Sequence, residues 1–204
     1  AGVRFIQFIP IVERSPHGGG TDSPVTPRSV SGKEYGDFMI AIFEEWVKRD
    51  VGQVYIQACD AALGAWFGTP PSMCAHAPTC GAAVVLEHNG DVYSCDHFVD
   101  TAYRLGNINE RHLSELVGSE QQRAFGLAKK QGLPRYCRDC EVLFACQGGC
   151  PKDRVLTAPN GQPGLNYLCS GYRAFFNHVR GPMKTMAELL RQGRAPAEIM
   201  IRSR

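Results

Sequence analysis

The sequence predicts an α/β fold in its first 70 residues and an α+β, cysteine-rich domain after them. The first observation is an alternation of strand-like and helix-like stretches before Pro71, which is typical of the closing units of an α/β barrel or of an open sheet. The second is that eight of the nine cysteines lie between Cys74 and Cys169, among short elements and turns. We therefore expect three parts, at residues 1–70, 71–192 and 193–204.

The elements of the first part follow from local patterns. Residues 3–9 form a nearly continuous apolar run, as expected of a strand buried on both faces of a sheet. Ser31 and Glu34 have the spacing of a capping box, after which apolar side chains recur at helical intervals. The sequence predicts, in order, a strand at 3–9, a Pro/Gly/Ser-rich loop at 15–30, a helix from Ser31 to about 50, a strand at 51–57 and a short helix at 60–67.

The second part is expected to contain a hairpin and several short helices. Asn89 and Gly90 stand between two apolar runs and are a strong signal for a two-residue hairpin turn, so residues 82–87 and 91–95 are expected to pair. The last ten residues are expected to be frayed. The predicted helices are one from Ser119, capped with Gln122, to about 131, and amphipathic helices after Cys169 and after Pro182.

Charge and hydropathy exclude several classes of protein. The 22 basic and 20 acidic side chains are mixed along the chain and give a net charge of +2, so no basic stripe indicates a nucleic-acid partner. No apolar run approaches the roughly 20 residues that span a bilayer, and the N-terminus lacks the pattern of a signal peptide. We expect no membrane association and a cytoplasmic location. The absence of an initial methionine indicates a piece of a longer protein.

The cysteines carry most of the functional signal. Structural disulfides seldom persist in a reducing compartment, so ligation of a metal or cluster is the leading explanation for so many thiols. A zinc ribbon would normally show two matched C-x2-C pairs, whereas this chain has one. Eight cysteines suffice for two four-thiolate sites, which matches two 4Fe-4S clusters. The densest run is Cys137-x2-Cys140-x5-Cys146-x3-Cys150, followed by Pro151.

The proline at the end of this run bears on how the ligands are shared. In bacterial ferredoxins the cysteine before such a proline ligates the other cluster of a pair, which groups Cys150 with the earlier cysteines. Zinc ligation and disulfides stay as alternatives. Oxygen destroys exposed clusters, and the freed thiols can then take up zinc or oxidise.

The whole pattern resembles a known family. The spacing Cys80-x14-Cys95, with Gly90 five residues before Cys95, then the run to Cys150 and finally Cys169, is similar to the seven-cysteine SPASM domain of peptide-modifying radical S-adenosylmethionine enzymes. The additional Cys74, the segment YSCDHFVD and the opening QFIPIVER resemble more narrowly the anaerobic sulfatase-maturating enzymes, a family often labelled arylsulfatase regulators. The resemblance implies the C-terminal strands and helices of a partial TIM-like barrel, followed by a SPASM iron-sulfur domain.

The resemblance also implies ligands, cofactors and a partner. Full-length members bind S-adenosylmethionine and a third 4Fe-4S cluster, and they oxidise a cysteine or serine in a Cys/Ser-x-Pro-x-Arg segment of a sulfatase to formylglycine. Two auxiliary 4Fe-4S clusters would transfer electrons. Asp96 matches the family's proposed base, which requires that burial raise its pKa, and Gln7 and Pro10 match a strand near S-adenosylmethionine. The implied ligands are Cys74, Cys80, Cys95 and Cys150 for cluster I, and Cys137, Cys140, Cys146 and Cys169 for cluster II.

The chain departs from the family pattern in one respect. It lacks the C-x3-C-x2-C spacing that holds the cluster which cleaves S-adenosylmethionine. We therefore expect the chain alone to be inactive, to need a missing N-terminal barrel half, and to self-associate through exposed apolar surface. The alternatives are another SPASM enzyme, one that forms thioether or carbon-carbon crosslinks, and a zinc-stabilised protein-interaction module. Cys59 is expected to be a buried apolar side chain, and His76 and His97 to be imidazoles beside the ligands.

Overall fold

The computed structural model describes residues 2–15 and 23–202. These pack as two compact units: unit 1 comprises residues 1–77 and 134–204, and unit 2 comprises residues 78–133. The predicted boundary at 70/71 separates domains that follow one another in the sequence, whereas the two units are defined by packing. The boundary therefore stays a prediction. The predicted loop at 15–30 lies partly outside the described residues. Within the described ranges, every helix is too short or too polar to traverse a lipid bilayer.

Unit 1 contains a two-stranded parallel sheet, formed by β1 (Phe5–Ile6) and β2 (Tyr55–Ile56). The helix α1 (Gly32–Arg49) lies between them in the sequence, which confirms the predicted order of strand, helix and strand. Ile56 packs into the core, but Phe5 is 77% exposed, so the prediction of a strand buried on both faces is wrong. The reason is that, among the described residues, no further strand pairs with these two and no layer covers Phe5.

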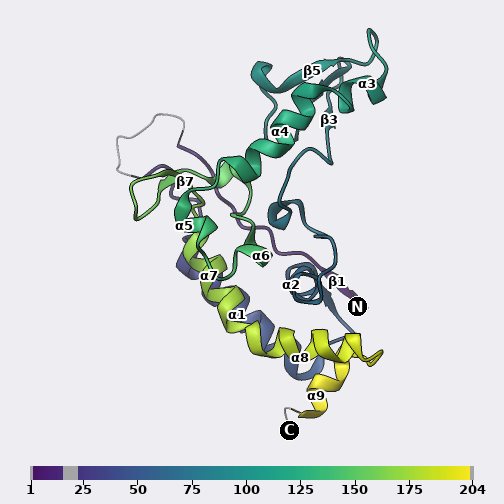
Figure 1. Ribbon diagram of the computed structural model, residues 1–204, viewed down its shortest axis with the longest axis vertical. Helices are drawn as coiled ribbons and strands as arrows, with labels where there is room; N and C mark the ends of the chain where they lie inside the picture. Colours follow the sequence, from purple (N-terminus) through teal and green to yellow (C-terminus); the bar gives the residue numbers. More distant parts are fainter. Residues whose placement is uncertain (1, 16–22, 203–204) are drawn as a thin grey trace. The chain divides into compact units, whose positions relative to one another are not determined.

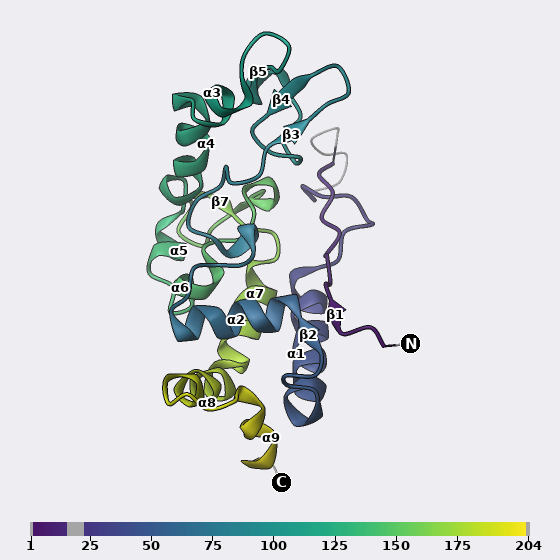
Figure 2. The same ribbon diagram turned by 90° about the vertical axis from the view of Figure 1, so that its right-hand side faces the viewer.

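Helix α1 begins with the predicted capping box. The Ser31 hydroxyl accepts a hydrogen bond from the Glu34 N–H, and the Glu34 carboxylate accepts one from the Ser31 N–H. Figures 1 and 2 show α1 lying along α7 (Cys169–His178). Gly171 permits this close approach, because a Cβ there would lie 2.1 Å from the Gly32 carbonyl oxygen. The contact fixes the first turn of α7.

Among the described residues, the core of unit 1 joins apolar side chains of six helices, one of which is the short helix α6 (Leu143–Cys146). The expected core position of Cys59 is confirmed, since its side chain is fully buried there. The expectation of a frayed tail is wrong at Ile199, which is only 6% exposed and packs against this core, while residues 203–204 lie outside the described residues. Helix α2 starts earlier than predicted because β2 ends after Ile56. Besides α1, α6 and α7, the helices are α2 (Gln57–Phe67), α8 (Arg180–Arg191) and α9 (Ile199–Arg202).

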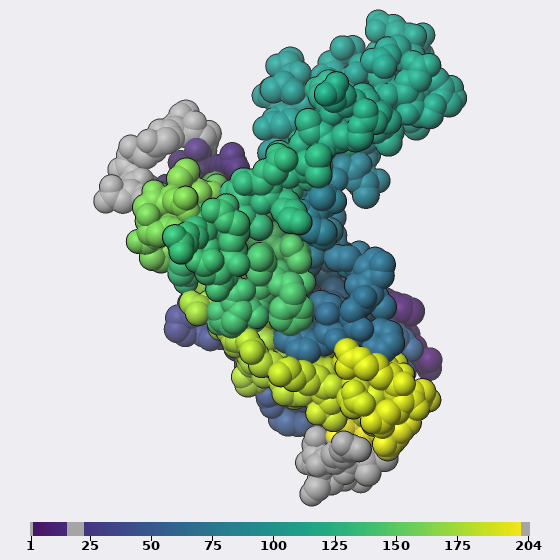
Figure 3. All heavy atoms as spheres, viewed as in Figure 1, coloured from purple at the N-terminus to yellow at the C-terminus, as the bar shows by residue number. Residues whose placement is uncertain are grey.

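The cysteine-rich run of unit 1 folds as tight turns, and Figure 3 shows it in green beside the yellow-green helix α7. After Cys146 the chain reverses through Gln147, Gly148 and Gly149, whose φ angles are 51°, 71° and 63°. Two of these three are glycines because that region of φ is open to them. The short elements are η1 (Cys74–His76), α5 (Arg135–Arg138), α6 (Leu143–Cys146), η3 (Pro151–Asp153), η4 (Pro196–Glu198), and the antiparallel pair β6 (Leu156–Thr157) and β7 (Pro163–Leu165).

Unit 2 is a three-stranded antiparallel sheet with two helices. The hairpin around Asn89 and Gly90 is confirmed, but its loop has three residues, 88–90, instead of two, because the Glu87 N–H donates to the Asp91 carbonyl. Gly90 closes this loop with a φ of 90°. The third strand was not predicted, although it pairs with the hairpin along its length. Ser119 caps the last helix as predicted, by accepting from the Gln122 N–H. The elements are β3 (Val85–Leu86), β4 (Asp91–Tyr93), η2 (Thr101–Tyr103), β5 (Arg104–Asn107), α3 (Leu113–Val117) and α4 (Glu120–Gln131).

Candidate metal centre

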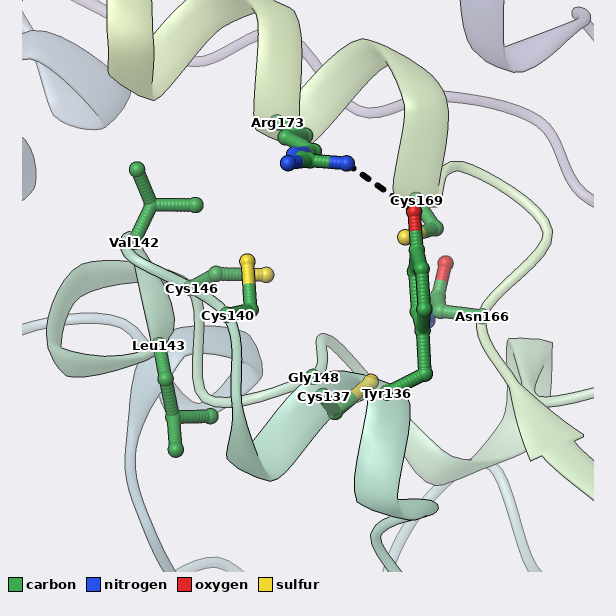
Figure 4. A pocket seen from close by; sticks show the side chains of 10 residues that line it. All are labelled: Tyr136, Cys137, Cys140, Val142, Leu143, Cys146, Gly148, Asn166, Cys169 and Arg173. Atoms are coloured by element: carbon green, nitrogen blue, oxygen red, sulfur yellow. Dashed lines mark hydrogen bonds between the residues drawn. The ribbon is translucent and has the colours of Figure 1, made fainter. Parts of the chain in front are cut away.

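Four of the predicted ligands line one pocket of unit 1. Figure 4 shows the sulfur atoms of Cys137, Cys140, Cys146 and Cys169 facing a common space. The pocket holds about 370 Å³ of space not filled by atoms, part of it open to solvent. No disulfide joins these four thiols. The rest of the wall is formed by Tyr136, Val142, Leu143, Gly148, Asn166 and Arg173.

Backbone turns bring these thiols together. The Cys140 N–H donates to the Cys137 carbonyl at 3.1 Å, which closes the C-x2-C turn. The Val142 N–H donates to the Cys140 sulfur, and the Gly148 N–H donates to the Cys146 sulfur. Such N–H groups stabilise a thiolate and orient it as a ligand. The fourth thiol arrives from a distant part of the sequence, on the first turn of α7.

Burial makes all four thiols weak acids. It raises the pKa of Cys146 to about 12 and that of Cys169 to about 11, and it also raises the pKa values of Cys137 and Cys140. These groups are therefore protonated near neutral pH. Because iron and zinc bind the thiolate, ligation must release protons, and a bound cation supplies the charge that makes this favourable. The donor set fits a soft, positively charged centre.

The four thiols do not surround a single ion as they stand. Within residues 2–15 and 23–202, no three His, Cys, Asp or Glu side chains are gathered closely enough to hold one metal ion. A tetrahedral zinc site would need all four sulfurs at roughly 2.3 Å from the same point.

The predicted ligands of cluster I are divided between the two units. Cys74 and Cys150 belong to unit 1, whereas Cys80 and Cys95 belong to unit 2. Within unit 1, the Asn166 side-chain amide donates to the Cys150 carbonyl at 3.1 Å.

In unit 2, helix α4 anchors the chain beside two predicted ligands through Gln122, which is 3% exposed. Its Nε2 donates to the Gly81 carbonyl at 3.1 Å and to the Ser94 carbonyl at 3.2 Å. These carbonyls each lie one residue from a predicted ligand, Cys80 or Cys95. Sequence reasoning found Gln122 only as a partner of a helix cap, because a glutamine on a helix carries no signal for burial.

Asp96 lies on the surface of unit 2, next to a predicted ligand. Its Oδ1 accepts a hydrogen bond from the Cys95 thiol at 3.1 Å. This hydrogen bond lowers the pKa of Asp96 by more than burial raises it. The expected rise in its pKa is therefore absent, and the carboxylate is ionised near neutral pH.

The strands of unit 1 border a second, open pocket of about 920 Å³. Gln7 lies in its wall, together with Gln57 and Asp60, whereas Pro10 is not among the lining residues. Burial alone raises the pKa of Asp60 to about 6. Sequence reasoning missed Asp60, although a carboxylate one turn after the end of a parallel strand is a usable signal.

The two histidines flanking ligand cysteines differ in their surroundings. His76 is buried, with Nδ1 at 3.2 Å from the Cys146 carbonyl oxygen and its ring edge-to-face with Tyr172 and Phe176. His97 is exposed. His76 therefore supports the backbone of a pocket cysteine through its ring.

A guanidinium closes one side of the four-thiol pocket. Arg173, one turn into α7, forms an ion pair with Glu141 at 3.1 Å and donates to the Tyr136 hydroxyl at 3.0 Å, drawn as a dashed line in Figure 4. Glu141 also accepts from Asn177 at 3.0 Å, and these hydrogen bonds lower its pKa to about 2. The cation and the anion of this pair are thus both fixed in place.

Comparison with known proteins agrees with the thiol pattern. Residues 74–141 match the SPASM family model, described as an iron-sulfur cluster-binding domain. The chain is 48% identical, over 96% of its length, to the serine-type anaerobic sulfatase-maturating enzyme of Bacteroides thetaiotaomicron, and 31% identical, over 92%, to the cysteine-type enzyme of Clostridium novyi. It spans about half the length of these relatives, 50% and 49%.

Solved structures show the same likeness. The structure of native anSMEcpe with bound AdoMet and Cp18Cys peptide superposes with a TM-score of 0.76 at 27% identity, covering 92% of this chain and 51% of that one. The mixed α/β architecture of this chain is therefore that of these proteins.

Proposed function

Because the chain belongs to the family of anaerobic sulfatase-maturating enzymes, we propose that it is the electron-transferring, C-terminal part of an enzyme that oxidises a sulfatase cysteine or serine to formylglycine. The observation that carries this proposal is the pocket in which four thiols converge. Since the chain spans about half the length of its relatives, the activity, the client and the partner of the whole enzyme belong to the proposal. The client segment is Cys/Ser-x-Pro-x-Arg.

We assign the pocket to one auxiliary 4Fe-4S cluster, cluster II, held by Cys137, Cys140, Cys146 and Cys169. When bound, such a centre accepts and passes on single electrons. Four thiolates would leave it no site open to substrate, which favours electron transfer over substrate ligation. A second cluster, cluster I, is assigned to Cys74, Cys80, Cys95 and Cys150. Its support is the spacing of these residues and the family match over 74–141.

The residues of the chain have separate tasks in this scheme. The left-handed turn at Gln147 to Gly149 lets backbone amides face the thiolate sulfurs, which keeps them oriented. The apolar wall of Val142 and Leu143 limits the access of water and oxygen to them. The glycine contact between α1 and α7 holds Cys169 at the pocket.

Asp96 is assigned as the base that takes the thiol or hydroxyl proton of the client side chain. Its ionised state near neutral pH leaves it able to accept a proton. The lowering of its pKa comes first from the hydrogen bond that the Cys95 thiol donates, and it therefore describes the protein before Cys95 is a ligand. A thiolate at Cys95 no longer donates to Asp96, so ligation of that cysteine frees the carboxylate for this role.

The parallel strands of unit 1 are assigned to a partial barrel. Phe5 and Tyr55 stack at 5.0 Å on the open face, while Ile56 on the other face enters the core. In the whole enzyme the N-terminal barrel half would cover this open face, and S-adenosylmethionine would lie near Gln7 and Pro10. In the isolated chain a second copy would cover it. A cytoplasmic location is assigned from the thiol chemistry.

The test is anaerobic conversion of a client peptide by the full-length enzyme. We expect an aldehyde in a peptide that carries Cys/Ser-x-Pro-x-Arg, with S-adenosylmethionine consumed, and no aldehyde from the 204-residue chain alone. Asp96→Asn should keep the cleavage of S-adenosylmethionine but lose most of the aldehyde. A crosslinked peptide in place of the aldehyde would assign the protein to another class of SPASM enzyme.

A further inference from the structure

The charges beside the four-thiol pocket are arranged asymmetrically. Arg173 is part of the pocket wall, whereas its partner Glu141 is not. The Arg173 guanidinium is held by both Glu141 oxygens, at 3.1 and 3.3 Å, and by the hydroxyl of Tyr136, another residue of the wall, at 3.0 Å. Figure 4 shows the guanidinium over the space between the sulfur atoms. A centre in the pocket would therefore have the positive member of the pair in its wall, while the negative member lies beside the Cys140 sulfur.

The same charge acts on two of the ligands. Burial raises the pKa values of Cys140 and Cys169, whereas the Arg173 charge lowers them and so favours their thiolates. Glu141 has the opposite effect at Cys140, because its Oε2 lies 3.6 Å from that sulfur. Without Arg173, a carboxylate would stand unneutralised beside a thiolate ligand.

We propose that Arg173, by presenting a fixed positive charge and neutralising Glu141, raises the reduction potential of the centre held by Cys137, Cys140, Cys146 and Cys169. This inference rests on the proposed function. Reduction adds one electron to the centre, so a nearby cation stabilises the reduced form relative to the oxidised form. Arg173 thereby makes the centre a better electron acceptor.

The experiment is a redox titration of the anaerobically reconstituted protein, followed by electron paramagnetic resonance. The signal to follow is the one that Cys169→Ala abolishes. Arg173→Gln should shift the equilibrium toward the oxidised centre about tenfold, which for one electron is a fall of about 59 mV. Arg173→Lys should have a potential close to that of the wild type, since lysine keeps the positive charge and loses only the two-point hydrogen bonding of the guanidinium to Glu141.

Two further variants separate charge from structure. Glu141→Gln should raise the potential, and Arg173→Gln combined with Glu141→Gln should fall between the two single variants, because both charges are then gone. The matched control is Arg191→Gln in α8. Arg191 is similarly exposed and is also paired with a carboxylate, that of Glu188, but it does not line the pocket. This control should leave the potential unchanged.

The outcomes distinguish the inference from the proposed function. An unchanged potential in Arg173→Gln, with iron and sulfide content intact, refutes the role of Arg173 alone. Equal falls in Arg173→Gln and Arg173→Lys refute it as well, because geometry rather than charge would then be at work. A wild-type protein that binds no iron and no sulfide refutes the proposed function, and with it this inference.

Discussion

Replacing Gly171 with alanine tests how the pocket is built, because this glycine sets the distance between α1 and α7. A Cβ at Gly171 would lie 2.1 Å from the Gly32 carbonyl oxygen and 2.9 Å from the Gly36 nitrogen. Both are backbone atoms, so no side chain can rotate away. Since ordinary contacts are near 3.5 Å, the helices would have to separate by roughly 1 Å.

The magnitude follows from two opposing effects. Overpacking of this kind costs about 1–3 kcal/mol, and backbone against backbone belongs at the upper end. Alanine regains about 1 kcal/mol over glycine in a helix. We therefore expect Gly171→Ala to lower the free energy of unfolding by about 2 kcal/mol. Because Cys169 lies in the same turn of α7, we also expect less iron per chain.

The assay is urea unfolding of the anaerobically reconstituted protein, with iron measured on the same samples. The control is Gly181→Ala in α8, where a new Cβ meets no atom within 4 Å. That substitution should be neutral or stabilising by up to about 1 kcal/mol. If Gly171→Ala proves as stable as Gly181→Ala and retains its iron, the argument from helix proximity is wrong.

Three other predictions concern single side chains. Burial raises the pKa of Asp60 from 3.8 to about 6, so its contribution to stability is full below about pH 4 and is lost as the pH rises through 6. Asp60→Asn should therefore flatten the pH dependence of the unfolding free energy between about pH 4 and 6, by at most about 2 kcal/mol in urea unfolding, and an unchanged slope would contradict this. Gln122→Ala removes the hydrogen bonds to Gly81 and Ser94 and should lower the free energy of unfolding in urea by about 1–3 kcal/mol. It should also reduce the iron bound through Cys80 and Cys95. The control Gln121→Ala, at an exposed position, should have neither effect. Cys59→Ala should lower the unfolding free energy by about 1 kcal/mol and leave the iron content intact, since this thiol fills core space; loss of iron would show that it is a ligand.

Local signals of the sequence predicted the parts of the fold whose causes are local. The capping box at Ser31, the hairpin at Asn89 and Gly90, and the cap at Ser119 are each decided by a few neighbouring residues, and all three are confirmed, although the hairpin loop is one residue longer than predicted. The burial of residues 3–9 was predicted wrongly, because the sequence of a strand does not reveal how many neighbours the strand has. The core position of Ile199 was missed because it depends on contacts with helices that are distant in the sequence.

The candidate site was likewise predicted only in part. The resemblance to the SPASM domain predicted as one ligand set the four thiols that line the pocket, whereas the number of cysteines alone indicated only two four-thiolate sites. The supporting side chains Arg173, Gln122 and Asp60 were not predicted as parts of a site. Charged and polar residues on helices are common, and only their tertiary neighbours give these three a role.

The most direct test of the account is the content of iron, acid-labile sulfide and zinc per chain after anaerobic purification and reconstitution. Two 4Fe-4S clusters would give about eight irons and eight sulfides, falling toward about four of each in Cys74→Ala and in Cys169→Ala. The two variants should lose different spectral signals, because their cysteines belong to separate ligand sets. About two zinc ions with no sulfide would contradict the electron-transfer account and would favour a zinc-stabilised interaction module.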